Sequence, residues 1–323
     1  MKSQVAGCRL LIADQAGSAA SPLDAGAQGA ARPASSIINR KSETVNGFTL
    51  IEVMVVMVLL SLIVISLMAV FNSTQSAFRA SVTQTDVLEG GRAAMDLITE
   101  DLRAMAPSMS YSNNIAAANF YVGNYYTNPP LVQSLVASSG TRTNVQRDVF
   151  ILSRGNLNGV PTWYGTGYAV YQSSSNTYSL YRFSTNRPVA QTVAASNLFN
   201  ADFVNFRAYP NNPNSPNYSH LLDGVVDFRV QAYDANGALI TTNRMNIRTN
   251  ALPDGVGYVF FSNALPASVE IEMATLEDRT LQRAGTWPNG STAQINYLAQ
   301  QSGKVHVFRQ RVAIPNVDPS VYQ

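Results

Sequence analysis

One apolar run constrains this chain more than any other feature. It extends from Phe48 to Phe71, and from Val53 onward it contains no charged residue and only Ser61 and Ser66 as polar ones. As a helix that rises about 1.5 Å per residue, this 24-residue run would measure about 36 Å. That length exceeds the roughly 30 Å of a bilayer's hydrocarbon core, so the sequence predicts a membrane-spanning helix. The simplest interpretation is a plain signal anchor.

Glu52 is the charged residue in this run, and it lies four residues after Phe48 without a basic neighbour. Charged side chains cost about 2.5–3.5 kcal/mol at the centre of a membrane helix and less toward its ends. In a signal anchor, the carboxylate would therefore be tolerated among the headgroups or in its protonated form. Alternatively, it waits for a cation, with which it would pair strongly in a medium of low dielectric constant.

The residues before the run indicate its orientation. Arg40 and Lys41 precede it, and positive charge tends to stay on the cytoplasmic side, so the rest of the chain is expected to be exported. The first 46 residues are rich in Ala, Gly, Ser and Pro without apolar periodicity, which favours a disordered or discarded leader. A start codon chosen too far upstream would explain the leader's length equally well.

The helix is expected to continue past the apolar run as an amphipathic segment over 72–107. Its apolar stripe consists of Phe78, Val82, Leu88, Met95, Ile98, Leu102 and Met105. The spacing from Met95 to Met105 is helical, and Pro107 is a natural stop. The sequence thus predicts one helix of more than 50 residues whose second half packs on a soluble domain. Gly90 and Gly91 are a weak point within it, where the helix could bend or break.

From Tyr111 onward the pattern changes to alternating residues separated by turn residues. Strands are predicted at 148–154, 168–183 (a hairpin), 224–240 (with an Asn-Gly turn), 267–276 and 304–314, with loops at 211–219 and 285–294. A long helix followed by a mostly antiparallel sheet is an α+β arrangement.

Charge and cysteine content exclude several function classes. Charged residues make up 13% of the chain, and the net charge of +2 arises within the first 47 residues. The rest is neutral with Lys304 as its only lysine, which does not favour nucleic-acid binding. Cys8 is the only cysteine, and too few apolar residues precede it for a lipoprotein signal. The body therefore has neither disulfides nor thiolate metal sites, and we expect no cofactor and no metal.

The catalytic motifs are weak. His220 in a predicted loop and His306 in a predicted strand have no metal-ligand spacing and no nucleophile motif beside them. The segment "DANG" at 234–237 fits a hairpin turn better than a calcium loop. Glu270 and Glu272 are expected on the solvent face of a strand rather than as an acid pair.

Two further segments have glycine-rich or aromatic composition. The glycines of "GNLNG" at 155–159 lack the lysine and the strand-to-helix context of a phosphate loop. An aromatic cluster in a predicted loop is either a contact patch or ordinary packing, and it comprises Phe120, Tyr121, Tyr125 and Tyr126.

The hexapeptide "GFTLIE" at 47–52, followed by the apolar helix, resembles the N-terminal signature of type IV pilins and type II secretion pseudopilins. The resemblance implies that a prepilin peptidase cleaves after Gly47 and N-methylates Phe48, the new N-terminus. It also implies that Glu52 meets the amino group of a neighbouring subunit during filament assembly. A helix cannot fold the chain's own amine back onto Glu52, so a neighbour's amine is the fitting cation.

The resemblance implies a pilin-like organisation. It divides the chain into a leader at 1–47, a transmembrane and filament-core helix at 48–71, the amphipathic continuation at 72–107 and a β-rich globular domain at 108–323. The residues expected in the membrane and the filament core are Leu50, Ile51, Val53, Val56, Leu60, Ile63, Leu67 and Phe71. The mature chain would be 48–323, anchored in the inner membrane with its C-terminal domain exported, and later part of a pilus or pseudopilus in the periplasm or at the cell surface.

Further segments are similar to PilW-like minor pilins and J-type pseudopilins, namely 91–107, 265–278 and 307–314. A large body without cysteine favours a minor, low-copy subunit over a major pilin. Its expected partners are other pilins or pseudopilins in a priming or tip complex, the prepilin peptidase and the inner membrane. The alternative function is a single-pass membrane-anchored exported enzyme or ligand-binding protein, whose anchor would keep residues 40–47.

Overall fold

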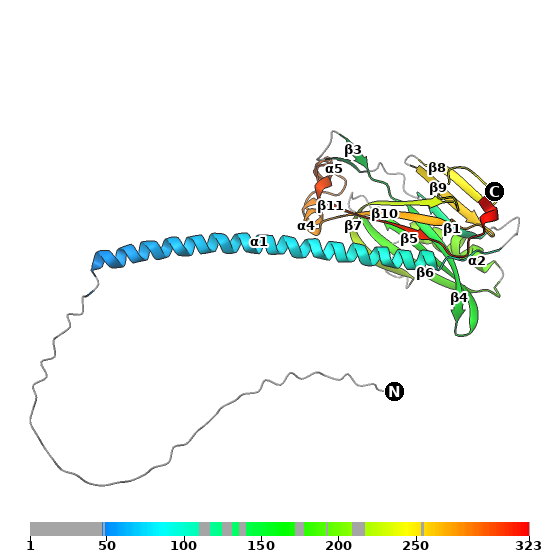
Figure 1. The fold of residues 1–323 in the computed structure, drawn as a ribbon, viewed down its shortest axis with the longest axis horizontal. Helices are drawn as coiled ribbons and strands as arrows, with labels where there is room; N and C mark the ends of the chain where they lie inside the picture. The colour runs from blue at the N-terminus through cyan, green and yellow to red at the C-terminus, as the bar shows by residue number, and fades with distance from the viewer. Residues whose placement is uncertain are drawn as a thin grey trace, which may run out of the picture. The chain divides into compact units, whose positions relative to one another are not determined.

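The computed structural model describes residues 47, 49–109, 117–124, 131–135, 140–171, 178–191, 193–208, 217–252 and 255–322. The chain divides into two compact units, Met1–Ile63 and Val64–Gln323. Helix α1 (Leu50–Arg103, 54 residues) starts in the first unit and continues into the second, where a β-sheet domain follows it (Figure 1). The predicted α+β fold is confirmed.

The sheet is antiparallel between all neighbouring strands that the structure describes. Its order is β11-β10-β7-β6-β5-β4-β1-β9-β8. The strands are β1 (Ala118–Gly123), β4 (Asp148–Leu157), β5 (Val160–Tyr171), β6 (Tyr178–Pro188), β7 (Tyr218–Tyr233), β8 (Ile247–Leu252), β9 (Gly255–Phe261), β10 (Ser268–Leu276) and β11 (Val305–Ala313). A separate pair consists of β2 (Val132–Ser134) and β3 (Thr141–Thr143). Every predicted strand has a counterpart.

Turn chemistry explains how several of these strands are joined. The "GNLNG" segment is the β4–β5 hairpin, in which Asn158 and Gly159 have φ of 50° and 82°. Two positive φ angles in a two-residue loop define the type I′ turn that Asn-Gly favours. The predicted hairpin at 168–183 is confirmed by the β5–β6 register, although residues 172–177 at its tip lie outside the described part.

Several short helices were not predicted. They are α2 (Ala194–Asn197), the π-helical η1 (Leu198–Phe203), α3 (Val204–Ala208), α4 (Asp278–Ala284), α5 (Thr292–Ala299) and the 3₁₀ turns η2 (Ser302–Lys304) and η3 (Pro319–Tyr322). The predicted loop at 285–294 is therefore wrong at its end, where α5 begins with Ser291 accepting a hydrogen bond from the Gln294 backbone N–H. Helices of so few residues show too little periodicity to be recognised, and packing on the sheet stabilises them.

Successive side chains along a strand point to opposite faces of the sheet, and a hydrophobic core forms on each face. In β4, Val149 and Ile151 pack in the cluster that includes α1, whereas Phe150 and Leu152 pack on the opposite face with η1 and α3. A third cluster joins Val226 of β7 and the end of β10 to α4 and α5. The sheet is thus the middle layer, with α1 on one face and α2, η1 and α3 on the other.

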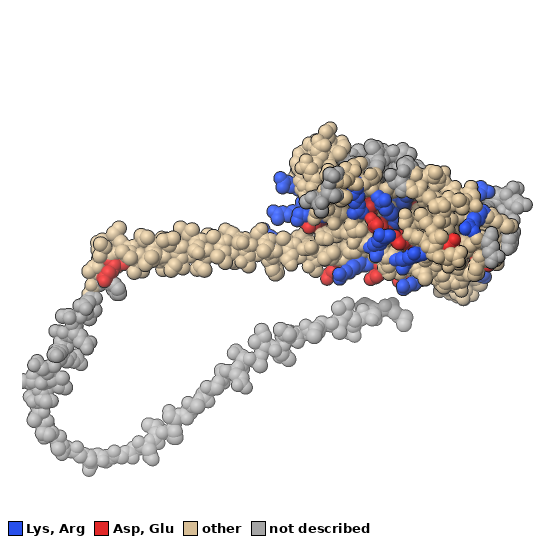
Figure 2. Space-filling model, turned by 45° about the horizontal axis from the view of Figure 1, so that its top comes forward, with Lys and Arg blue, Asp and Glu red and all other residues tan. Residues whose placement is uncertain are grey.

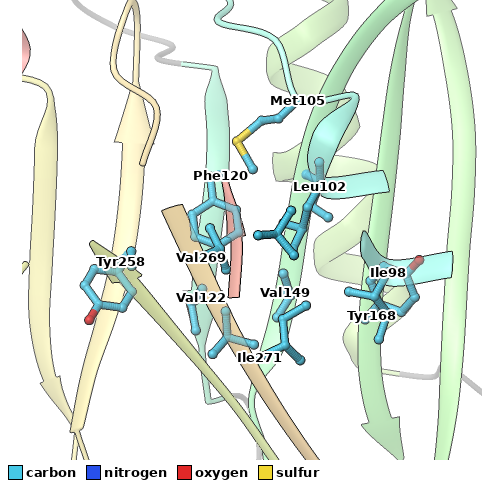
Figure 3. Packing of buried hydrophobic residues seen from close by; sticks show 14 of the residues in the cluster. Ile98, Leu102, Met105, Phe120, Val122, Val149, Tyr168, Tyr258, Val269 and Ile271 are labelled. Atoms are coloured by element: carbon cyan, nitrogen blue, oxygen red, sulfur yellow. The ribbon is translucent and has the colours of Figure 1, made fainter. Parts of the chain in front are cut away.

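Helix α1 becomes buried only in its last third. Ile98 and Leu102 are buried against β1, β4 and β5, and Figure 3 shows them beside Val149 and Tyr168. Phe78 and Val82, by contrast, are 70% and 44% exposed, so their assignment to the packed stripe was wrong. Burial starts at Val87 because the sheet reaches no further along the helix.

The end of α1 differs from the prediction by a few residues. The helix ends at Arg103, before Pro107, because Met105 leaves it to form a bridge with Ser153 of β4. The Ala106 backbone N–H then donates to the carbonyl of Leu152. Met105 is still buried, as expected, but as part of an extended segment and not of the helix. Pairing with the sheet therefore ends the helix.

A carboxylate on α1 ties the helix to the sheet. The guanidinium of Arg182 in β6 donates from Nε and Nη2 to the two oxygens of Asp101, each at 2.9 Å, and the Tyr168 hydroxyl donates to the same carboxylate. Burial, followed by the Asp101 charge, raises the pKa of Tyr168, which therefore remains a donor. This bidentate ion pair between Arg182 and Asp101 fixes the rotation of the helix about its axis.

Gly91 determines how closely α1 approaches β11. A Cβ atom at this position would lie 2.3 Å from ring atoms of Phe308, whereas at Gly90 the nearest atom is the flexible Cδ1 of Leu222 at 3.2 Å. The helix passes through both glycines without a break, as one continuous helix of more than 50 residues requires.

We expect Gly91→Ala to lower the free energy of unfolding by about 1–2 kcal/mol, because overpacking outweighs the gain in helix propensity. Gly90→Ala is the control and should be neutral or slightly stabilising. Urea unfolding of the detergent-solubilised protein measures both variants. Equal stabilities would contradict a packing role for Gly91.

Candidate functional site: the first turn of the N-terminal helix

Glu52 lies in the first turn of α1 and closes a capping box with Thr49. The Thr49 backbone N–H and hydroxyl both donate to Glu52 Oε2 at 2.9 Å, and the Glu52 backbone N–H donates back to Thr49 Oγ1 at 3.4 Å. This reciprocal arrangement satisfies backbone donors that a helix start leaves without intrahelical partners. The capping box was not among the predicted features, although the spacing Thr-x-x-Glu is its recognised signal in a sequence.

No ion pair among the described residues involves Glu52, in agreement with the absence of a basic neighbour in the sequence. Both hydrogen bonds from Thr49 end on Oε2. Within the described part of the chain, Oε1 therefore keeps its lone pairs for a donor from elsewhere. The first turn thus holds the carboxylate in a defined position while one of its oxygens stays available.

Gly47 is exposed two residues before Thr49, and a Cβ there would meet no described atom within 4 Å. Packing against the described residues gives no reason for a glycine at this position. Phe48 lies outside the described residues, so its predicted role stays a prediction.

The helix after Glu52 presents an apolar surface on all sides. The predicted membrane and filament-core residues are all exposed in the single chain: Leu50, Ile51, Val53, Val56, Leu60, Ile63, Leu67 and Phe71. Figure 2 shows a red side chain near the start of the helix and then a long stretch without blue or red side chains. Among the described residues, α1 is the helix long and apolar enough to cross a membrane. An apolar surface of this extent has to be covered by lipid or by other protein.

Comparison with known families bears on this same stretch of the chain. Residues 44–68 match the family described as the prokaryotic N-terminal methylation motif. The chain therefore carries a type IV pilin-like prepilin signal. No match is found among curated proteins or among solved structures.

The prepilin signal starts at residue 44 and covers the capping box and the apolar part of α1 as far as residue 68. It points to a structural pilin-type protein, to processing by a prepilin peptidase and to assembly with other pilins. Together with the apolar helix, it fits a membrane-anchored protein with an exported domain. Because the match ends before the globular domain, it does not distinguish between subclasses of pilins and pseudopilins.

In the described residues, neither histidine hydrogen-bonds a nucleophilic side chain or belongs to a metal-ligand set. The Ser179 hydroxyl donates to the Asp223 carboxylate that His220 contacts, and not to the imidazole. His220 lies in strand β7, not in the predicted loop, with Nε2 at 2.8 Å from Asp223 Oδ1. His306 lies in β11, as predicted, with Nε2 at 3.5 Å from Glu277 Oε1. No group of three or more potential metal ligands occurs among the described residues.

The "DANG" segment is a turn after β7, as predicted. Asp234 Oδ1 accepts from the backbone N–H groups of Asn236 and Ala238 at 3.0 and 2.9 Å, and Gly237 has a φ of 78°. The carboxylate is thus used to hold the turn. Asn236 and Gly237 supply the chemistry that this hairpin connection needs.

Phe120 and Tyr121 of the aromatic cluster lie in strand β1 and not in the predicted loop. Phe120 is buried in the main core, so it forms no contact patch, and Tyr125 and Tyr126 lie outside the described residues. The Tyr121 hydroxyl accepts a hydrogen bond from Arg207 at 2.6 Å, and Arg207 also pairs with Asp148 at 3.3 Å. Burial raises the pKa of the Asp148 carboxyl, while the Arg207 charge opposes that shift.

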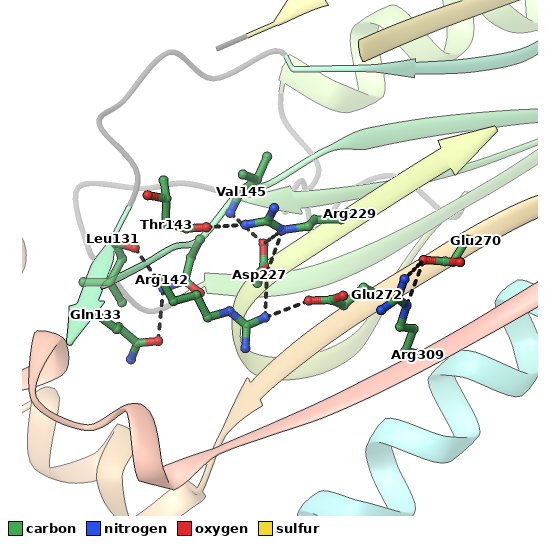
Figure 4. Close-up of polar contacts among 11 residues, drawn as sticks. Leu131, Gln133, Arg142, Thr143, Val145, Asp227, Arg229, Glu270, Glu272 and Arg309 are labelled. Atoms are coloured by element: carbon green, nitrogen blue, oxygen red, sulfur yellow. Dashed lines mark hydrogen bonds and ion pairs between the residues drawn. The ribbon is translucent and has the colours of Figure 1, made fainter. Parts of the chain in front are cut away.

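A buried carboxylate that the sequence analysis missed lies at Asp227 in β7 (Figure 4). Its side chain is fully buried and accepts from the Val145 backbone N–H at 2.6 Å, from Arg142 Nη2 at 2.7 Å and from Arg229 Nε at 3.0 Å. Arg142 also donates to Glu272 at 3.0 Å.

Glu270 and Glu272 of β10, which were predicted on the solvent face, are both partly exposed. Glu272 binds Arg142, and Glu270 binds Arg309 of β11 with Nε at 2.8 Å. Each carboxylate is neutralised by its own arginine, so the two do not form an acid pair. The whole network connects β3 and the segment after it to the main sheet, and its chemistry is that of a structural tie.

Proposed function

We propose that this protein is a prepilin-type structural subunit that is cleaved after Gly47, N-methylated on Phe48 and assembled through its N-terminal helix into a type IV pilus or a secretion pseudopilus. The prepilin signal at 44–68 carries this proposal. The exposed apolar surface of α1 supports it, because lipid covers that surface before assembly and neighbouring helices cover it afterwards.

The proposed division of the chain follows from this route. Residues 1–47 are the leader, 48–71 the membrane and filament-core helix, 72–107 its amphipathic continuation and 108–323 the exported domain. The helix itself ends at Arg103, so the third segment includes a short extended piece. Arg40 and Lys41 keep the leader cytoplasmic.

Within the filament, we propose that Glu52 pairs with the methylated amine of a neighbouring subunit's Phe48. The capping box supports this role, because Thr49 holds the carboxylate in place and leaves Oε1 to accept. In the low dielectric of a helix bundle, such a pair is strong and defines the axial register of the two helices.

We further propose a minor subunit of the priming or tip complex, similar to PilW-like minor pilins and J-type pseudopilins. The segments 91–107, 265–278 and 307–314 carry that similarity. In the structure they correspond to the buried end of α1 and to the neighbouring strands β10 and β11, so they form one contiguous part of the domain.

Intact-mass and N-terminal mass spectrometry of the membrane-extracted protein tests the proposal. The expected result is a chain that begins at Phe48 and carries one additional methyl group. Gly47→Val should abolish cleavage and leave the precursor in the membrane. The change should not disturb the fold, because a Cβ at Gly47 meets no described atom within 4 Å. Recovery of the wild-type chain with residues 40–47 attached would contradict the proposal and favour a membrane-anchored enzyme or ligand-binding protein.

A further inference from the structure

A polar groove of about 780 Å³ lies between α1 and the helices α4 and α5, within the second unit of the chain. Its α1 wall starts at Asn72, directly after the apolar run ends at Phe71, and includes Arg79. Its opposite wall includes Arg279 and Arg283 of α4. The groove therefore begins at the residue where the predicted membrane span ends.

The groove contains guanidinium groups without carboxylate partners. Among the described residues, no ion pair involves Arg79, Arg279 or Arg283, and all of these side chains are exposed. Figure 2 shows basic side chains that project beside the helix just beyond its uncharged length.

Other charged groups also line the groove. Asp86 and Asp278 carry negative charge there, while Glu277 is neutralised by Lys304 at 3.5 Å. The three unpaired arginines therefore exceed the two unpaired carboxylates, and the groove carries a net positive charge. Arginine matches phosphate geometry with two parallel hydrogen bonds, so a phosphate group is the ligand that this surplus fits.

The groove lies at the level along the helix axis where lipid headgroups are expected. A helix rises about 1.5 Å per residue, so Arg79 lies about 10 Å along the axis from Asn72. The polar headgroup layer adds roughly 5–7 Å to each side of the hydrocarbon core. An arginine side chain can bridge the remaining distance, since its long apolar stem lets the charged end reach the interface.

Aromatic groups line the same region. The ring of Tyr297 in α5 packs on Trp287 with 4.8 Å between centroids, and Arg283 lies over Tyr297 at 5.5 Å. Phe78, beside Arg79, is highly exposed. Tyrosine and tryptophan are enriched at membrane interfaces because their rings combine an apolar body with a polar edge.

We propose that this groove binds the phosphate of an anionic phospholipid in the leaflet facing the exported domain. This inference rests on the proposed function in one respect, namely that residues 48–71 span the membrane. Lipid binding holds α4 and α5 against the membrane before assembly, and withdrawal of the subunit into a filament breaks the contact.

The test uses the full chain in nanodiscs of phosphatidylcholine alone or mixed with phosphatidylglycerol. Hydrogen exchange over α4 and α5 is compared between the two. We expect slower exchange in the anionic discs, with protection that falls on the order of fivefold for each arginine removed. The triple variant Arg79→Gln, Arg279→Gln, Arg283→Gln should lose the lipid-dependent protection.

The control variant carries Arg103→Gln, Arg154→Gln and Arg248→Gln, three exposed arginines outside the groove, so its charge change is the same. It should keep the lipid-dependent protection. Equal protection in both triple variants would overturn the proposal. Protection by inorganic phosphate in phosphatidylcholine discs would also overturn it, in favour of a soluble phosphate ligand.

Carbonate extraction separates this inference from the proposed function. A chain that is extracted as a soluble protein contradicts the membrane span itself, and with it the proposed function. A chain that stays in the membrane but shows no phosphatidylglycerol dependence overturns the lipid site alone.

Discussion

Glu52→Ala should leave the chain inserted in the membrane and cleaved after Gly47, yet exclude it from the filament. Removing one partner of a buried ion pair costs about 3–5 kcal/mol, which corresponds to a hundredfold or larger loss in the equilibrium for incorporation. The measurement is the ratio of mature subunit in sheared filaments to that in the membrane fraction. Incorporation at the wild-type ratio would refute the pairing role of Glu52.

Two companion variants separate charge from helix capping at the same site. Glu52→Gln keeps the size of the side chain and an acceptor for Thr49 but removes the charge, so it should fail to assemble as Glu52→Ala does. Thr49→Ala removes the hydroxyl of the capping box and keeps the carboxylate. Its expected cost is about 1 kcal/mol of helix stability, with assembly retained. Failure of Thr49→Ala together with assembly of Glu52→Gln would show that capping, and not charge, is the function.

Asp227→Ala should destabilise the globular domain by about 3–5 kcal/mol, because it leaves two guanidinium groups and a backbone N–H without their shared acceptor. For a domain of this size, each kcal/mol lowers the Tm by about 2–4 °C, so a fall on the order of 10 °C is expected. Thermal unfolding followed by circular dichroism of the solubilised protein measures it.

Glu272→Gln is the matched control for Asp227→Ala. It also breaks an ion pair with Arg142, but in this pair both side chains are partly exposed. The exposed fraction is 21% for Arg142 and 26% for Glu272. Pairs of this kind contribute at most about 1 kcal/mol. A Tm for Asp227→Ala that equals the Tm of Glu272→Gln would contradict the proposed tie between β3 and the main sheet.

Local chemistry explains which parts of the fold were predictable. Strand β10 alternates Val269, Ile271 and Met273 toward the core with Glu270 and Glu272 away from it, and this period is visible in the sequence itself. Asn-Gly pairs mark their turns because few other residues adopt positive φ angles. Helix α1 was predictable because its apolar run is too long for any other element.

Contacts between distant segments explain the errors. Phe78 and Val82 continue the apolar stripe of α1, but their exposure depends on where the sheet ends, which no local pattern contains. The same holds for Gly91, whose neighbour Phe308 belongs to the last strand. Short helices such as α4 and α5 form only because Val226 of β7 and the end of β10 provide an apolar surface for them.

The sequence by itself determined the prepilin signal, the apolar helix and several of the strands, because each depends on residues that are neighbours along the chain. The tertiary structure alone decided how the charges are used. Asp227 meets Arg142 across 85 positions, and Arg142 meets Glu272 across 130. The groove of unpaired arginines likewise joins α1 to α4 across most of the chain. Folding brings these groups together because strand pairing, and not sequence proximity, places them side by side.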